Sequence, residues 1–232
     1  MSKRKEFIEK LEEVRELAEE LLGEADRAEP ATPCDRNGEL LEVGDLVSAN
    51  RRFSYQFTKV DQQGEIWFQD IKDGWEGTLK PGWVKKLTSL TRDQYLPLAR
   101  RTLSPDLTKK ETLSMLTLGA MGEWEEWMSS KTAEELGDCL WYLTLLCDEL
   151  NAFGYGAATG FSSPSAVVEV MKKYIYHDTH DAQAREMVWR WLCHAEDCAV
   201  LVGSTAEELR LQNIKKLLAR YPEGFVTGGG ER

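Results

Sequence analysis

Residues 119–143 read GAMGEWEEWMSSKTAEELGDCLWYL, and this stretch decides the fold expected for the C-terminal half of the chain. It contains two pairs of carboxylates, Glu123 with Glu126 and Glu135 with Asp138. The members of each pair are three positions apart, and residues at that spacing lie on one face of a helix. The stretch therefore predicts two helices, each with an acidic face.

A turn separates the two pairs. One helix is expected to end near Ser129 and the next to begin near Thr132. In a tight antiparallel hairpin the two acidic faces then lie side by side. Carboxylates at close range repel one another strongly unless cations neutralise them, and Mg²⁺, or Mn²⁺ in its place, prefers such oxygen ligands. The first hypothesis is a metal site made of Glu123, Glu126, Glu135 and Asp138.

A simpler interpretation of the same residues needs no metal. Glu126 suits a solvated helix face, and Glu135 stands where a capping box begun by Thr132 would use it. Against this interpretation, Glu123 and Asp138 have large apolar neighbours in the sequence, so part of this surface should be packed. A mirrored arrangement of acids across a turn is also rare by chance.

These residues resemble a family, the MazG-like all-α nucleoside triphosphate pyrophosphohydrolases, which carry Glu-x-x-Glu on one helix and Glu-x-x-Asp on the next. Residues 118–126, LGAMGEWEE, are similar to the family motif GL-x-GE-x-GE. Residues 135–143, ELGDCLWYL, match its ELGD-x-LWYL motif. Tyr95 and Arg101-Thr102 stand where the first helix of the family often has Tyr and an Arg-Thr pair.

The end of the chain extends the resemblance. Residues 213–225, NIKKLLARYPEGF, are similar to the closing helix of the family, and the resemblance as a whole covers about 92–151 and 204–226. It implies hydrolysis of a nucleoside triphosphate between the α and β phosphates, with Mg²⁺ held by the four carboxylates. It also implies that Asn213 and Lys216 contact the sugar and the phosphates, and an ammonium is a suitable point charge for a polyphosphate.

Two aromatic residues of the second motif have an open role. Trp141 and Tyr142 could stack on a nucleobase, and they suit the core of a helical bundle equally well.

An insertion at about 152–204 separates the two matching parts and is predicted to add two helices. These helices are candidates to replace contacts that relatives obtain from a second subunit, and a homo-oligomer, a dimer or a tetramer, is expected. The insertion lacks the ligand spacing of a zinc site. We expect structural or surface roles for its potential ligands, which are His177, His180, Asp181, Cys193, His194 and Cys198.

Thr-x-x-Gln and Thr-x-x-Glu patterns mark the starts of several predicted helices as capping boxes. These patterns begin at Thr91, Thr108, Thr132 and Thr205, and Ser163-Pro164 marks a further start. Six helices are predicted, at 92–102, 109–129, 132–151, 164–177, 181–201 and 206–220.

The N-terminal part has a different pattern. Apolar side chains at four- and three-residue spacing over 4–28 predict an amphipathic helix, whose apolar seam packs either on the same chain or on a second copy. Residues 31–90 resemble a small SH3-like β barrel, with strands near 46–49, 55–60, 65–69, 75–79 and 83–87. Core packing is the expected role of its tryptophans, and an aromatic recognition face is the alternative.

The expected fold class is therefore multidomain α+β. The expected parts are an N-terminal helix at 1–30, an SH3-like β domain at 31–90, a MazG-like all-α domain at 91–226 and a disordered tail at 227–232.

Composition limits the classes of partner. The chain has 232 residues, 42% of them hydrophobic, and a net charge of −11, which disfavours duplex nucleic acid and anionic membrane surfaces. The N-terminus lacks the apolar core of a signal peptide, and the five cysteines show no disulfide framework, so a cytoplasmic protein with reduced thiols is expected.

Two further function classes compete with the enzyme. One is a non-catalytic nucleotide-binding protein whose SH3-like domain and N-terminal helix recruit a partner. The other is a di-iron carboxylate bundle, which needs Glu-x-x-His, and neither carboxylate pair has that histidine.

Overall fold

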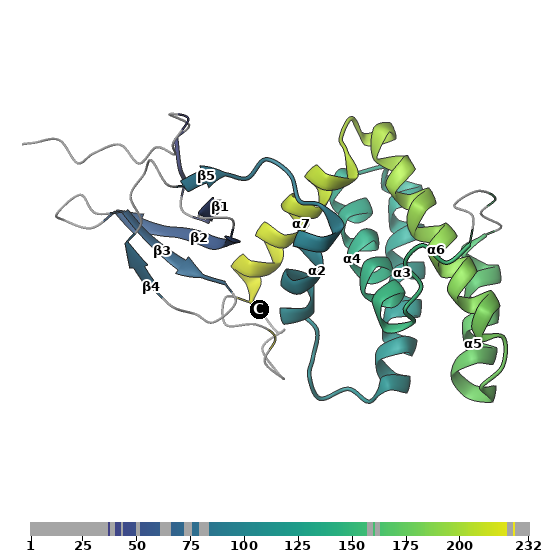
Figure 1. Cartoon of the computed structure of the whole chain (residues 1–232). Coiled ribbons are helices and arrows are strands. Elements are labelled where there is room, and N and C mark those ends of the chain that lie inside the picture. The colour runs from purple at the N-terminus through teal and green to yellow at the C-terminus, as the bar shows by residue number, and fades with distance from the viewer. Residues whose placement is uncertain are drawn as a thin grey trace, which may run out of the picture.

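The fold is α+β, an antiparallel five-stranded sheet followed by six α-helices (Figure 1). The computed structural model describes residues 37, 40–42, 44–49, 52–60, 66–71, 76–78, 84–156, 160, 163–221 and 225. The predicted helix at 1–30 and the predicted tail at 227–232 lie outside the described residues.

The sheet is formed by strands that were all expected from the sequence. They are β1 (Leu46–Ala49), β2 (Arg52–Val60), β3 (Ile66–Asp70), β4 (Glu76–Thr78) and β5 (Val84–Lys86). Their order in the sheet is β4-β3-β2-β1-β5, so the last strand returns to pair with the first. Each strand is antiparallel to its neighbours.

The predicted closure of this sheet into an SH3-like barrel is wrong for the described residues. Closure needs hydrogen bonds between the two edge strands, β4 and β5, and in the described part of the sheet these strands pair only with β3 and β1. Each edge strand is three residues long, which gives little backbone for a second partner. The sheet is therefore open.

Six α-helices follow at the predicted places. They are α2 (Arg92–Arg101), α3 (Lys109–Ser130), α4 (Ala133–Glu149), α5 (Pro164–His177), α6 (Asp181–Asp197) and α7 (Ala206–Arg220). The segment predicted as one helix at 181–201 divides into α6 and the 3₁₀ helix η2 (Cys198–Val202). Thr91, Thr108 and Thr205 form complete capping boxes, whereas the box predicted at Thr132 is only half formed.

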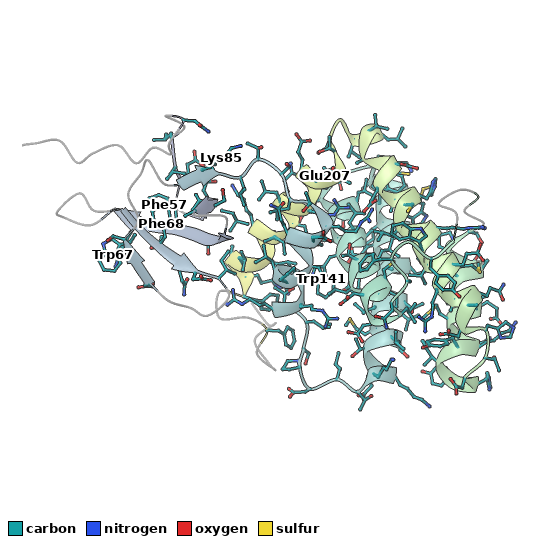
Figure 2. All side chains as sticks on the ribbon, in the orientation of Figure 1. Phe57, Trp67, Phe68, Lys85, Trp141 and Glu207 are labelled. Carbon is teal, nitrogen blue, oxygen red and sulfur yellow. The ribbon has the colours of Figure 1, made fainter. Side chains whose placement is uncertain are left out.

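Two apolar cores follow from the alternation of side chains along a strand. Leu46 and Ile71 belong to the large core of the helices, whereas Val47, the next residue along β1, belongs to a small core within the sheet. The small core is Leu41, Val47, Ala49, Phe57 and Phe68. Figure 2 shows Phe57 and Phe68 in the sheet, apart from Trp141 among the helices.

The tryptophans of the β domain were expected in its core. Trp67 is instead partly exposed, and the ammonium of Lys59 lies 5.1 Å from its ring centroid. Trp75 and Trp83 lie outside the described residues. The phenylalanine pair supplies the large rings that the small core requires.

One buried carboxylate joins the sheet to α7. Asp45 is 3% exposed, accepts a hydrogen bond of 3.0 Å from the amide of Glu42, and forms ion pairs with Lys86, at 2.7 Å, and with Lys215 of α7. Burial acts to raise the pKa of Asp45, but the hydrogen bonds from Glu42, Lys215 and Lys86 outweigh it and lower the pKa. The carboxylate therefore stays charged and binds both lysines.

A second ionic group holds α7 to the helices on its other side. Arg210 is 1% exposed and pairs with Glu196 of α6, which also accepts hydrogen bonds of 2.8 and 2.6 Å from Arg92 of α2. In Figure 1, α7 and α2 lie between the sheet and the remaining helices. The helix α7 is thus fixed at several points along its length.

None of the helices in the described part of the chain combines the length and the apolar character needed to cross a membrane.

The junction at Asp45 can be tested by substitution. Asp45→Asn should lower the free energy of unfolding by about 2–4 kcal/mol at pH 7, because two lysines lose their buried countercharge. The native pKa lies below that of the unfolded chain, so the contribution is present above about pH 4 and is lost as the pH falls through the native pKa. Urea unfolding at pH 7 and pH 3 measures this, and an equal difference at both values would contradict it.

Candidate metal centre

The hairpin between α3 and α4 positions the site. Lys131 ends α3 in the left-handed conformation, with φ of 56°, and its amide donates a hydrogen bond of 2.7 Å to the carbonyl of Trp127. Thr132 then caps α4. The chain reverses within these two residues, and the predicted tight antiparallel hairpin is confirmed.

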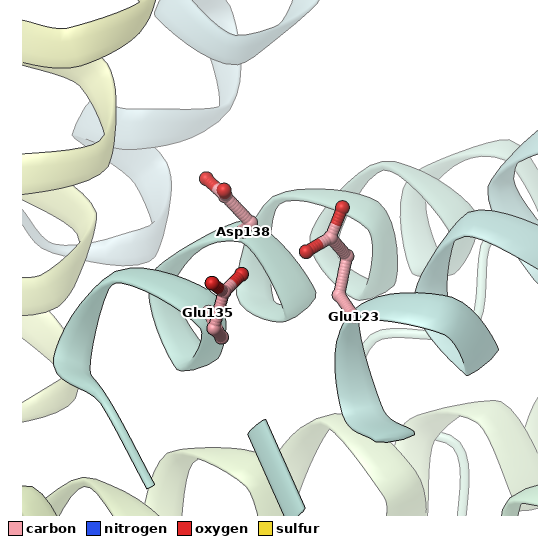
Figure 3. A group of neighbouring side chains, drawn as sticks. All are labelled: Glu123, Glu135 and Asp138. Atoms are coloured by element: carbon pink, nitrogen blue, oxygen red, sulfur yellow. The ribbon is translucent and has the colours of Figure 1, made fainter. Parts of the chain in front are cut away.

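Three of the four predicted carboxylates meet between the two helices. One oxygen each of Glu123, Glu135 and Asp138 lies within 4.8 Å of the others, and all three side chains are partly buried. Figure 3 shows Glu123 on α3 facing Glu135 and Asp138 on α4. These three residues are called the acidic trio below. Such a set of oxygen donors suits Mg²⁺ or Mn²⁺, which fill their remaining positions with water or phosphate.

The fourth predicted carboxylate does not join the trio. Glu126 is exposed, whereas the neighbouring Trp127, which is 2% exposed, lies on the buried side of α3. The charge of Glu126 nevertheless acts on Glu123, so the two groups remain close.

The side chain of Glu135 does not form the capping box that the simpler interpretation of the sequence expects. The hydroxyl of Thr132 accepts a hydrogen bond of 3.4 Å from the backbone amide of Glu135, but the amide of Thr132 donates to the hydroxyl of Ser130, at 3.3 Å. In the complete capping boxes of this chain, the glutamate or glutamine side chain takes that amide. Ser130 thus substitutes for the carboxylate and leaves it to the trio.

The crowding of the acids is visible in their electrostatics. Burial raises the pKa of Glu123 to about 7, together with the charges of Asp138, Glu126 and Glu135. An ordinary glutamate titrates near 4.3, so the site favours an added positive charge, either a proton or a metal ion.

Asp138 has a partner on each oxygen. The amide nitrogen of Asn213 donates a hydrogen bond of 2.6 Å to Oδ1, and the ammonium of Lys216 binds Oδ2. The hydroxyl of Tyr95 donates to Oδ1 of Asn213 at 2.7 Å, which fixes the orientation of the amide. Tyr95 is fully buried, and this burial raises its pKa well above 10, so its hydroxyl remains a donor.

Asn213 and Lys216, the two residues predicted to contact the substrate, thus differ in burial and in hydrogen bonding. Asn213 is 4% exposed and already bonded on both sides, so it positions Asp138. Lys216 is partly exposed and also reaches Glu134, at 3.2 Å. Sequence reasoning missed Glu134, although it lies one helical turn before Asp138 on the same acidic face of α4.

A cavity of about 660 Å³ opens beside the trio, within the usual size of small-molecule sites. Its polar lining includes Glu123, Asp138 and Lys216. Its other walls are largely apolar and aromatic, and they include Leu107, Met115, Trp141, Tyr142, Leu217, Tyr221 and Phe225. No local pattern in the sequence predicts this cavity, because its walls come from three helices, α3, α4 and α7, from the segment between α2 and α3, and from residues that follow α7.

Trp141 and Tyr142 both line the cavity, and each is held in place. The indole nitrogen of Trp141 donates a hydrogen bond of 3.0 Å to the hydroxyl of Thr102, and the two rings meet edge to face at 4.8 Å between centroids. A Cβ atom at Gly119 would lie 2.1 Å from the ring of Tyr142, so only glycine fits there. Gly119, in the first motif, therefore leaves the space that the ring of Tyr142 occupies in the cavity wall.

The potential ligands of the insertion do not form a second centre. Cys198 and His194 approach each other to 4.0 Å, but no further ligand joins them, and across the described residues the acidic trio is the one group of three or more metal-ligating side chains.

No family model, curated protein or solved structure matches the chain. The resemblance to MazG-like enzymes therefore rests on the motifs quoted above.

The raised pKa of Glu123 predicts that the free energy of unfolding of the metal-free protein depends on pH. The native pKa of about 7 exceeds the unfolded value near 4.5, so ionisation of Glu123 destabilises the fold progressively between these values and fully above about pH 7. Glu123→Gln in the presence of a chelator should therefore gain about 1–2 kcal/mol at pH 8, after allowing for solvent screening, or roughly 3–6 °C in Tm.

At pH 5 the gain from Glu123→Gln should largely disappear, because the native carboxyl is then protonated. Thermal unfolding at both values is the measurement, and Glu125→Gln, at an exposed position next to the trio, is the matched control. A loss of stability at pH 8 would contradict the crowding described here.

Proposed function

We propose that the protein is a nucleotide pyrophosphohydrolase dependent on Mg²⁺ or Mn²⁺, which cleaves a (d)NTP between its α and β phosphates to give a nucleoside monophosphate and pyrophosphate. The observation that carries the proposal is the acidic trio, two members of which, Glu123 and Asp138, line a cavity that also has aromatic walls. A nucleotide combines the two kinds of group that such a lining suits, a flat aromatic base and a charged phosphate chain.

A divalent cation held by the trio would neutralise phosphate charge and lower the pKa of a bound water. The trio comes from two helices fixed by a two-residue turn, so its members are placed before any ligand arrives. Such preorganisation is what makes electrostatic stabilisation effective.

The other residues of the site have separate tasks in this proposal. Lys216 binds phosphate oxygens, and Asn213 with Tyr95 holds Asp138 in place. Glu126 lies outside the trio but close enough for its charge to act on Glu123. In this proposal Glu126 is the base that accepts the proton of the attacking water. Trp141 and Tyr142 form the wall against which a base would pack.

Further parts of the proposal concern the context of the enzyme. The return of β5 to β1 supports a distant relation of the open sheet to SH3-like domains. The four described cysteines are free, as in a reducing compartment, which supports a cytoplasmic location. A homo-oligomer remains the proposed assembly.

The function is tested by release of pyrophosphate from a panel of (d)NTPs with the full chain. We expect turnover that requires Mg²⁺ or Mn²⁺, and a loss of at least about 100-fold in kcat for Glu135→Gln and Asp138→Asn, since each removes one charged ligand. Glu125→Gln, which changes an exposed acid outside the trio, should leave kcat within about twofold, as is usual for surface substitutions.

Two outcomes would contradict the proposed enzymatic activity. Nucleotides that raise Tm without any turnover would favour the non-catalytic nucleotide-binding protein instead. Equal turnover by Asp138→Asn and the unchanged chain would remove the trio from the chemistry.

A further inference from the structure

Two consecutive lysines of α7 form ion pairs with different carboxylates. Lys215 pairs with Asp45 of the sheet junction, whereas Lys216 pairs with Asp138 of the trio and, at 3.2 Å, with Glu134. The exposed fractions of the two side chains are similar, at 35% and 38%. The chain thus contains a matched pair of lysines, of which only one touches the candidate metal centre.

Lys216 occupies a position that a bound cation would contest. Asp138 is only partly exposed, Asn213 already takes its Oδ1, and the ammonium is the charged partner of a carboxylate that belongs to the trio. A divalent cation at the trio would lie close to this ammonium, and two positive charges at such range repel strongly in a partly buried site. The cation and the lysine therefore compete for one carboxylate.

The lysine can leave Asp138 without movement of its helix. Other contacts fix α7, since Arg210 pairs with Glu196 and Lys215 pairs with Asp45. The flexible four-carbon stem of a lysine allows its ammonium to be relocated. The cavity of about 660 Å³ that Lys216 lines gives the ammonium space to enter.

We propose that Lys216 is the resident counterion of the acidic trio and that a divalent cation displaces it from Asp138 into the cavity, where it binds polyphosphate. This inference rests on the proposed function, because it requires that the trio holds a metal. It couples the two binding events, because a cation at the trio frees the ammonium that binds the anion. By linkage, polyphosphate must strengthen cation binding by the same factor.

The test measures binding of Mn²⁺ alone, without nucleotide, by calorimetry. Lys216→Met should bind Mn²⁺ about five- to tenfold more tightly than the unchanged chain, because the competing charge is gone. Lys215→Met, which removes a similar charge one position away, should stay within about twofold. Lys216→Arg keeps the charge and should also stay near the unchanged affinity.

A second measurement uses inorganic pyrophosphate as the anion. The unchanged chain should bind it at least about tenfold more tightly with Mg²⁺ than with a chelator, and Lys216→Met should lose most of this gain. Thermal unfolding of each variant checks that the fold is retained.

The outcomes separate this inference from the proposed function. If neither the unchanged chain nor any variant binds Mn²⁺, the acidic trio is not a metal centre and the proposed function is wrong. If the unchanged chain and Lys216→Met bind Mn²⁺ equally, the centre stands and the displacement is wrong. Weaker binding by Lys216→Met would also overturn it, as would an equal gain by Lys215→Met, which would indicate a general charge effect.

Discussion

The repulsion among the carboxylates of the α3–α4 hairpin is the constraint on which the site depends. Three acids meet between two helices, and the raised pKa of Glu123 shows the electrostatic cost of this arrangement. The surrounding polar groups offset part of this repulsion. Asn213 and Lys216 each take one oxygen of Asp138, and buried Tyr95 orients the asparagine that does so.

The helix α7 connects this electrostatic problem to the rest of the molecule. Lys216 and Asn213 contact the site, Lys215 contacts the sheet through Asp45, and Arg210 contacts α6 through Glu196. A single helix thus brings residues to the trio while it is itself held from two other directions. This rigidity lets one side chain change its partner while its neighbours stay in place.

Much of the fold follows from local patterns in the sequence. Five helix starts depend on capping side chains within four residues, whereas α6, which has no side-chain cap, was predicted from its apolar periodicity. The open sheet and the cavity depend on contacts between distant segments, which no local pattern encodes. The site lies between these cases: spacing predicted the three carboxylates that meet, but it also placed the exposed Glu126 with them, and the release of the Glu135 side chain from the cap depends on Ser130.

The two-sided character of β1 makes the sheet part of the helical body. Leu46 and Ile71 lie in the core of the helices, and Asp45 supplies the countercharge for Lys215. A shortened chain that began at α2 would expose the apolar surface that these two side chains cover. Removal of the sheet would therefore also take from α7 the carboxylate that Lys215 binds, so the stability of the helices depends in part on residues that precede them in the chain.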